Sequence, residues 1–136
     1  MKISIITVVK NGLPLLKSAI KSIKNQKKIE NLEHIIVCSP STDGTETYLN
    51  TLSNVKILID KDSTTRYGSI NKGINIASGD IIGLLHADDI FYDELTLYKI
   101  LQQFHDKNDV IYIFPHQIEI IPKNKFTYLP YSGVYP

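Results

Sequence analysis

Short β-branched apolar runs alternate along this chain with segments whose apolar residues recur at helical spacing. The apolar runs cover residues 3–9, 32–38, 55–59 and 80–85, and their length is typical of strands buried on both faces of a sheet. Helical spacing marks a segment around Leu16, Ala19, Ile20 and Ile23, and further helices are expected over 44–52, 67–77 and 93–105. This alternation predicts right-handed crossovers and a mainly parallel sheet covered by helices.

The last thirty or so residues are predicted to extend this pattern. "DVIYIFP" (109–115) is expected to form a fifth strand, and "HQIEIIP" with "KFTYLPY" a closing hairpin. The predicted fold class is therefore α/β: a mainly parallel, Rossmann-like sheet flanked by helices, with a C-terminal hairpin. A length of 136 residues with 43% hydrophobic residues predicts a single domain, 1–136, with a real core.

Composition excludes several classes of protein. A net charge of +1 gives no indication of nucleic-acid binding. The single cysteine, Cys38, excludes an intramolecular disulfide and fits a reducing compartment. The apolar run at the N-terminus is too short for a signal peptide or a membrane span, so a cytoplasmic location is expected. The sequence leaves open two kinds of partner: the inner face of the membrane, and a second copy of the chain in a homo-oligomer.

Four polar stretches follow the four predicted strands. They read "TVVKNG", "VCSPSTDG", "DKDSTTRYG" and "HADD". In open parallel sheets, ligands bind outside the carboxyl ends of the strands, where such loops gather. The four loops are therefore the predicted functional edge. Lys17, Lys21, Lys24 and Lys27 are expected to form a solvated helix face instead of a binding patch.

The stretch "GDIIGLLHADD" ends an apolar run with the adjacent acids Asp88 and Asp89. Two neighbouring carboxylates repel each other unless solvent or a cation compensates them. Mg²⁺ is often held by one or two carboxylates together with substrate phosphates, which makes both residues metal candidates. The alternative is that Asp89 or Asp93 caps the following helix. His86 is a candidate metal ligand, a phosphate or ribose contact, or a polar loop residue.

Two further local predictions concern "CSPSTDGTE". Asp43 is a candidate N-cap of the helix 44–52, with Glu46 three residues later as in a capping box. Cys38 is a poor candidate nucleophile, because His34 on the same strand face lies some 13 Å away at a rise of roughly 3.3 Å per residue.

The order of motifs resembles the N-terminal, nucleotide-sugar-binding part of a family 2 glycosyltransferase with the GT-A fold. The resemblance runs from about residue 3 to 121 and rests on "STDGT", then "NKGI", then "ASGDIIGLLHADD". It implies transfer of a sugar from a nucleoside-diphosphate donor to a glycan or lipid-linked acceptor, with inversion and with Mn²⁺ or Mg²⁺ as cofactor.

The resemblance also implies roles for individual residues. The first loop is expected beside the base and ribose, the second strand end against the base, and "RYGSINKG", including Lys72, near the donor pocket. Asp88, with Asp89 beside it, takes the place of the family's Asp-x-Asp metal element. The implied donor-binding residues are Thr7, Val9, Asn11, Cys38, Ser39, Arg66, Asn71, His86 and Asp88.

The chain departs from the family pattern in three places. Cys38-Ser39-Pro40-Ser41 lacks the carboxylate that accepts from the base, a loss of roughly 1 to 3 kcal/mol. Ser63-Thr64-Thr65 replaces Asp-x-Gly, and Gly68 replaces a frequent Asp. No acid follows Glu119, which is expected to be a solvated strand residue, so the acidic base needed for transfer is not found.

Two classes of function therefore stay open. The first is a metal-dependent glycosyltransferase, of which this chain is a donor domain truncated on the acceptor side. The second is a degenerate nucleotide-binding or partner module without autonomous transfer. A nucleotidyltransferase is disfavoured, because "VVKNGLPL" has a single glycine and a single lysine where a glycine-rich basic loop is expected.

Overall fold

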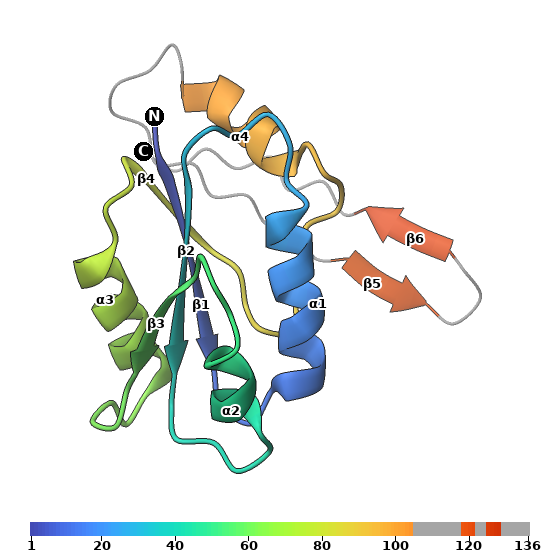
Figure 1. Cartoon of the computed structure of the whole chain (residues 1–136). Helices are drawn as coiled ribbons and strands as arrows, with labels where there is room; N and C mark the ends of the chain where they lie inside the picture. The colour runs from blue at the N-terminus through green and yellow to red at the C-terminus, as the bar shows by residue number, and fades with distance from the viewer. Residues whose placement is uncertain (105–117, 122–124, 129–136) are drawn as a thin grey trace. The chain divides into compact units, whose positions relative to one another are not determined.

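The computed structural model describes residues 1–104, 118–121 and 125–128 (Figure 1). The chain divides into two compact units, Met1–Leu101 and Gln102–Pro136. In the second unit β5 (Ile118–Ile121) and β6 (Lys125–Tyr128) pair antiparallel, as expected for the hairpin. The predicted strand over 109–115 lies outside the described residues, and the single domain over 1–136 stays a prediction.

The first unit is built on a parallel sheet, as the alternation of elements predicted. Its strands stand in the order β3-β2-β1-β4, with arrowheads of β1, β2 and β3 pointing the same way in Figure 1. The register of β1 against β2 runs from Ile3 opposite Leu32 to Val9 opposite Cys38. The strands are β1 (Ile3–Val9), β2 (Leu32–Cys38), β3 (Lys56–Ile59) and β4 (Ile81–Leu84).

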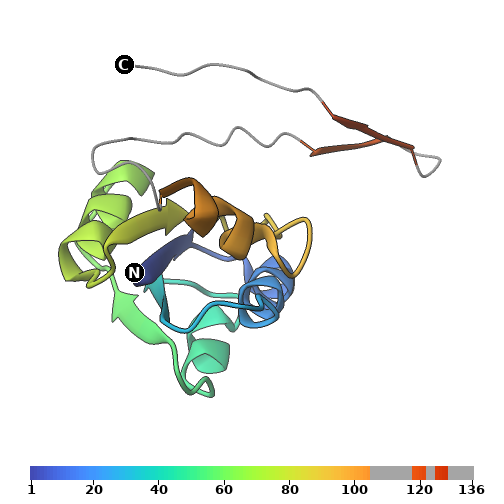
Figure 2. The same ribbon diagram turned by 90° about the horizontal axis from the view of Figure 1, so that it is seen from above.

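Helices cover both faces of this sheet because side chains alternate along each strand. Ile3, Ile5 and Val9 of β1 face the side covered by α1, α2 and α4, whereas Ile6 faces α3 with Val37 (Figure 2). The helices are α1 (Leu13–Lys24), α2 (Thr45–Leu49), α3 (Arg66–Ile76) and α4 (Thr96–Phe104). No helix in the part of the chain that the structure describes is long and apolar enough to cross a membrane.

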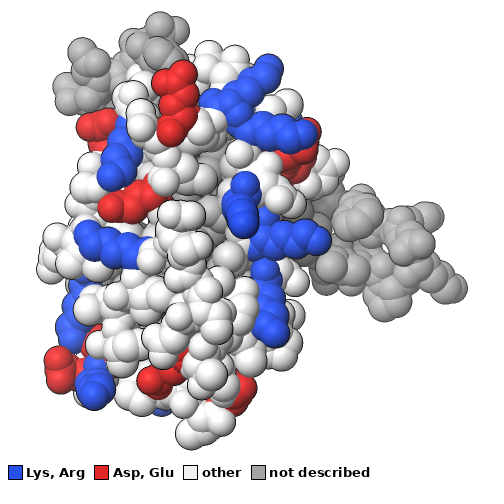
Figure 3. Space-filling view, viewed as in Figure 1, with Lys and Arg blue, Asp and Glu red and all other residues white. Residues whose placement is uncertain are grey.

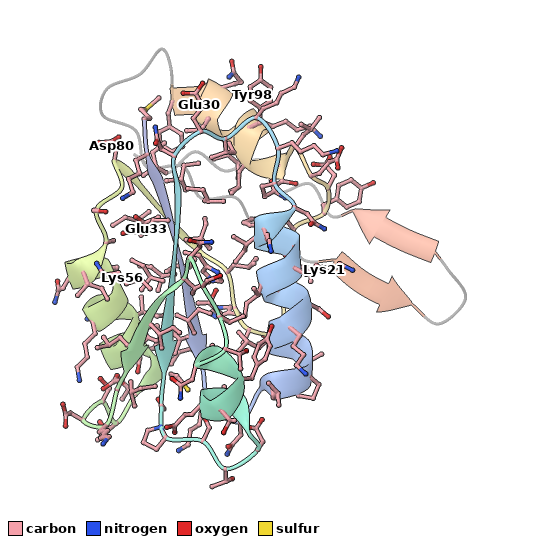
Figure 4. The ribbon with its side chains drawn as sticks, viewed as in Figure 1. Lys21, Glu30, Glu33, Lys56, Asp80 and Tyr98 are labelled. Atoms are coloured by element: carbon pink, nitrogen blue, oxygen red, sulfur yellow. The ribbon has the colours of Figure 1, made fainter. Side chains whose placement is uncertain are left out.

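Helix α1 shows the predicted amphipathic pattern. Its buried side chains are those named from the sequence, Leu16, Ala19, Ile20 and Ile23. Basic side chains gather over α1 in the space-filling view, and Lys21 points away from the sheet (Figures 3 and 4). The predicted solvated lysine face is confirmed, since Lys17, Lys21, Lys24 and Lys27 are all exposed.

The expectation that the run 80–85 is buried on both faces is wrong for the described part of the molecule. Ile82 and Leu84 are 43% and 52% exposed, whereas Leu85 is buried. The reason is position, because β4 pairs with β1 on one side and is the edge strand of the four-stranded sheet. A continuous apolar run does not distinguish a central strand from this half-covered edge strand.

Hydrogen bonds and one ion pair around Glu33 join the start of β4 to the amino ends of β1 and β2. Glu33 accepts hydrogen bonds from the Ser4 hydroxyl and from the N–H and hydroxyl of Ser78, and it lies 3.6 Å from the Lys2 ammonium (Figure 4). Burial alone would raise the pKa of Glu33, but these hydrogen bonds outweigh it and lower the pKa to about 2. A Cβ on Gly79 would stand 2.6 Å from the Ser4 backbone nitrogen, so "SGD" needs glycine for close approach to β1.

The predicted capping of the second helix is corrected. The N-cap of α2 is Gly44, whose φ of 88° lies in the left-handed region, and the helix covers Thr45–Leu49 instead of 44–52. Asp43 stands one residue earlier and accepts from the Thr45 N–H at 3.0 Å. Glu46 accepts from the Ser41 N–H, and not from the N-cap as in a capping box. The strands β1 and β2 have the predicted bounds, and the ends of β3, β4, α3 and α4 lie within three residues of the predicted ones.

A buried polar pair lies in the core between β1 and β2. The Thr7 hydroxyl and His34 Nε2 are 3.1 Å apart, and His34 is only 6% exposed. Burial lowers the pKa of His34 from 6.5 to about 4, because the charged imidazolium would be desolvated there.

We expect this histidine to make the fold sensitive to mild acid. The unfolded chain binds a proton at His34 near pH 6.5 and the folded chain only near pH 4, so stability is complete above pH 6.5 and falls as the pH drops from 6.5 to 4. The loss approaches about 3 kcal/mol in the free energy of unfolding. Urea unfolding of the wild type and of His34→Gln at pH 7, 5.5 and 4.5 measures it. An equal pH dependence in the two proteins would contradict this assignment.

Candidate functional site

A cleft of about 620 Å³ opens at the carboxyl edge of the sheet. All four polar loops contribute to it, as the parallel topology predicted. Backbone hydrogen bonds join the start of three of these loops to the neighbouring strand. The Ser39 N–H donates to the Val9 carbonyl at 2.9 Å, the Asp60 N–H to the Cys38 carbonyl at 2.8 Å, and the Leu85 N–H to the Ile6 carbonyl at 3.0 Å. The lining includes Val8 to Lys10, Gly12 and Leu15 after β1, Ser39 and Pro40 after β2, Asp60, Lys61, Ser63 to Arg66 and Ser69 after β3, and His86 to Asp88 after β4.

The structure brings five of the sequence-predicted site residues together in this lining. These five line the cleft although they lie far apart along the chain, namely Val9, Ser39, Arg66, His86 and Asp88. Arg66 is the first residue of α3, and Asp88 lies in the turn where Asp89 N–H donates to the His86 carbonyl.

Two other predicted residues lie beneath the cleft. Thr7 and Cys38 are both 0% exposed. The Thr7 hydroxyl is used by His34, and Cys38 Sγ donates to the Ser39 carbonyl at 3.2 Å. Their side chains support the floor of the cleft from within the core.

Asn11 lies beside the cleft and braces its loops. Its Oδ1 accepts from the Thr42 N–H at 2.7 Å, and its own N–H donates to the Ser41 hydroxyl at 3.0 Å. Asp43 adds a third bond of this kind by accepting from the Leu13 N–H at 2.9 Å. "STDGT" therefore joins the loop after β2 to the loop after β1.

Two of the predicted residues, Asn71 and Asp89, are exposed and do not line the cleft.

Asp60 is one of the lining residues that the sequence analysis did not single out. Its side chain is fully buried, and its Oδ1 accepts from the Lys72 ammonium at 2.6 Å and from the N–H groups of Asp62 and Ser63. Its Oδ2 accepts from the Ser69 hydroxyl at 2.6 Å. The Lys72 ammonium holds the pKa of Asp60 far below its usual range, and Asp60 in turn raises the pKa of Lys72. The one signal in the sequence that could have indicated Asp60 is its place directly after the third strand.

The electrostatics of the cleft favour an anion. Lys10, Lys61 and Arg66 line it, and none of the three forms a salt bridge with another residue that the structure describes. Asp60 is neutralised by Lys72, which leaves Asp88 as the uncompensated carboxylate among the described lining residues. A cleft lined by unpaired cations concentrates field and attracts a polyanionic ligand.

The acids after β4 have different surroundings. Asp88 is exposed in the cleft, whereas Asp93 accepts from the Leu95 N–H at 2.9 Å just before α4 and pairs with Lys99 at 2.6 Å. Asp93 therefore organises the turn that leads into α4, since its carboxylate also accepts from the Thr96 hydroxyl at 3.0 Å, and helix capping by Asp89 or Asp93 stays a prediction. Within the described ranges no three His, Cys, Asp or Glu side chains are grouped to hold a metal. A divalent cation at Asp88 would fit the chemistry of Mg²⁺ or Mn²⁺ only if its ligand supplied further oxygens.

The chain belongs to glycosyl transferase family 2, whose family model matches residues 4–131. It is 32% identical over 109 residues to an uncharacterised glycosyltransferase of Mycobacterium tuberculosis, covering 79% of this chain and 42% of that protein. A second uncharacterised glycosyltransferase, from Haemophilus influenzae, is 32% identical over 123 residues, or 88% of this chain and 37% of the relative. The chain thus spans less than half the length of these relatives.

Solved structures share the fold of this chain. A mannosyltransferase from Pyrobaculum calidifontis in complex with GDP-Man and Mn²⁺ superposes with a TM-score of 0.68 at 22% identity, covering 77% of this chain and 32% of that one. S. aureus TarS gives 0.65 at 24% identity over 75% of this chain and 19% of its own. Glucosyl-3-phosphoglycerate synthase from M. tuberculosis with Mn²⁺, UDP and phosphoglyceric acid gives 0.65 at 20% identity over 80% of this chain and 40% of its own. The predicted GT-A fold is confirmed.

The buried Cys38 gives a test of how tightly the floor of the cleft is packed. Burial raises the pKa of the Cys38 thiol, which disfavours the reactive thiolate. We expect this single thiol to react with an aromatic disulfide reagent at least ~100-fold more slowly in the folded protein than in 6 M urea. Reaction at the unfolded rate in buffer would show an open floor, and would revive Cys38 as a reactive group.

Proposed function

We propose that this chain provides the donor site of a glycosyltransferase that uses a nucleoside-diphosphate sugar. The observation that carries the proposal is the cation-lined cleft at the carboxyl edge of the sheet, where Lys10, Lys61 and Arg66 have no acidic partner among the described residues. A diphosphate supplies the negative charge that such a cleft attracts. Membership of family 2, and neighbours of the same fold named with UDP-GlcNAc or GDP-Man, support this ligand class.

Asp88 is the residue we assign to a divalent cation. One carboxylate with two diphosphate oxygens is a common way to hold Mg²⁺ or Mn²⁺, and Asp88 presents its carboxylate to the cleft. When bound, such an ion neutralises charge on the departing nucleoside diphosphate. Two neighbours of the same fold are named with Mn²⁺, which supports a divalent metal as the cofactor.

Base recognition falls to the wall formed by Ser39 and Arg66. Ser39 follows β2 and Arg66 opens α3, and both line the cleft. A serine hydroxyl is a neutral acceptor, so we expect weaker base recognition than a carboxylate at this position provides.

The acceptor side lies beyond the residues assigned here. An inverting transfer needs a carboxylate that takes the proton from the acceptor hydroxyl, and Asp88 is assigned to the metal. We propose a glycan or lipid-linked acceptor, with synthesis at the cytoplasmic face of a membrane. A donor-binding module without autonomous transfer is the second candidate function, favoured by the neutral Ser39 in the wall of the cleft.

Asp88 and Asp89 form a matched pair for testing the metal assignment. We expect UDP or GDP to bind at least ~10-fold more tightly with Mn²⁺ than with EDTA, and Asp88→Asn to abolish this difference because it removes the cleft carboxylate. Asp89→Asn should retain it, since its side chain lies outside the lining. Calorimetric titration of the three proteins measures the effect. Equal loss in both variants, or none in Asp88→Asn, would contradict the assignment.

A substitution that restores a carboxylate tests the base wall. Ser39→Asp should raise the affinity for UDP by ~10-fold, because a charged acceptor for the uracil N–H contributes about 1.4 kcal/mol more than a neutral one. ADP is the comparison ligand, since adenine has no ring N–H and can donate only from its exocyclic amine. If UDP affinity falls or stays unchanged while ADP behaves in the same way, Ser39 does not face the base.

A further inference from the structure

The loop between β3 and α3 is organised around one carboxylate. Asp60 has a side-chain exposure of 0%, although it borders the cleft. Its Oδ1 receives three donors, namely the Asp62 N–H at 3.2 Å, the Ser63 N–H at 3.0 Å and the Lys72 ammonium at 2.6 Å. A buried charge is tolerated only when it is paired and hydrogen-bonded, and Asp60 meets this condition through these three donors and the Ser69 hydroxyl on Oδ2.

These bonds join the loop to the helix that follows it. Asp62 and Ser63 belong to the loop, whereas Ser69 and Lys72 lie one turn apart on α3. The Asp60 carboxylate therefore fixes the path of the chain between its own position and α3. This path includes Ser63 to Arg66, which form one wall of the cleft.

Close packing beside the carboxylate leaves the loop little room to move. A Cβ on Gly68 would stand 3.1 Å from both Cβ and Oγ of Ser63, so the loop rests directly on the first turn of α3. Thr65 adds the N-cap of the same helix by accepting from the Gly68 N–H at 3.1 Å. A side chain at position 68 would therefore crowd the Ser63 side chain.

Asp60 is unsuited to contact a ligand itself. No surface of its side chain is exposed, and Lys72 cancels its charge, which keeps the cleft favourable for an anion. Its effect on a ligand must therefore pass through the wall that it holds.

We propose that Asp60, held by Lys72 and Ser69, is a positioning residue that fixes the Ser63–Arg66 wall in the conformation that binds a nucleoside diphosphate. The inference rests on the proposed function. A wall ordered before binding spares the ligand the entropy of ordering it, so affinity depends on a residue that the ligand never touches. Arg66 is the wall residue whose position depends most on Asp60. It begins α3, and Asp60 holds Ser63 before it and Ser69 after it.

The test compares variants that loosen the wall with one that does not. Asp60→Asn and Lys72→Gln should each weaken UDP binding in the presence of Mn²⁺ by ~10-fold or more, whereas Lys72→Arg should rescue most of the affinity by keeping the charge. The matched control is Asp62→Asn, whose carboxylate also lies near Lys72 at 3.4 Å but is 90% exposed, and which should bind UDP as the wild type does. Ser69→Ala, which removes one hydroxyl donor to Asp60, serves as a milder variant should Asp60→Asn not fold.

A second readout is independent of the nucleotide. Amide hydrogen exchange over residues 60–66 without ligand should become faster in Asp60→Asn and Lys72→Gln, and should stay unchanged in Asp62→Asn. Faster exchange with unchanged UDP affinity would overturn the positioning role and leave the proposed function intact. Unchanged exchange in both variants would show that Asp60 and Lys72 do not hold the Ser63–Arg66 wall. A wild type that binds neither UDP nor GDP would overturn the proposed function, and this inference with it.

Discussion

The parallel pairing of β1 with β2 on one side and β4 on the other is the constraint on which the site depends. Because all strands run in one direction, their carboxyl ends stand at one edge, and the loops that leave them must share it. The opposite edge is held by Glu33, which gathers donors from Ser4 and Ser78 and so fixes the entry into β4. One edge of the sheet is thus closed by internal ion and hydrogen bonds, and the other is open to ligand.

The charge distribution at the open edge follows from which cations are already used. Lys72 is taken by Asp60, whereas Lys10, Lys61 and Arg66 are left for a ligand. This arrangement also bears on the departures from the family pattern. Ser63 and Gly68 stand where relatives were expected to have acids, and these two positions contact each other while the nearby Asp60 supplies a carboxylate. The wall at these two positions is therefore organised by a buried carboxylate at Asp60.

Much of the first unit could be predicted from the sequence because its signals are local. Apolar runs and helical spacing gave the strands, the helices and the shared edge, and five predicted site residues do line the cleft. What failed depended on distant partners. Burial of the run 80–85 depends on whether β4 has neighbours on both sides, and the position of Asp43 depends on Gly44 adopting a left-handed conformation. Asp60 was missed because its importance comes from Lys72, which is twelve residues away along the chain and joins it only in the fold.

Hydrogen exchange with saturating UDP or GDP and Mn²⁺ is the measurement that shows whether the open edge of the sheet binds a nucleoside diphosphate. We expect slower exchange at residues 10–12, 39–42, 60–66 and 86–89, which belong to four separate loops. Residues 28–32 and 78–80, at the opposite edge, should show no change. Protection confined to that opposite edge, or no protection by either nucleotide, would rule out a nucleotide site at the open edge.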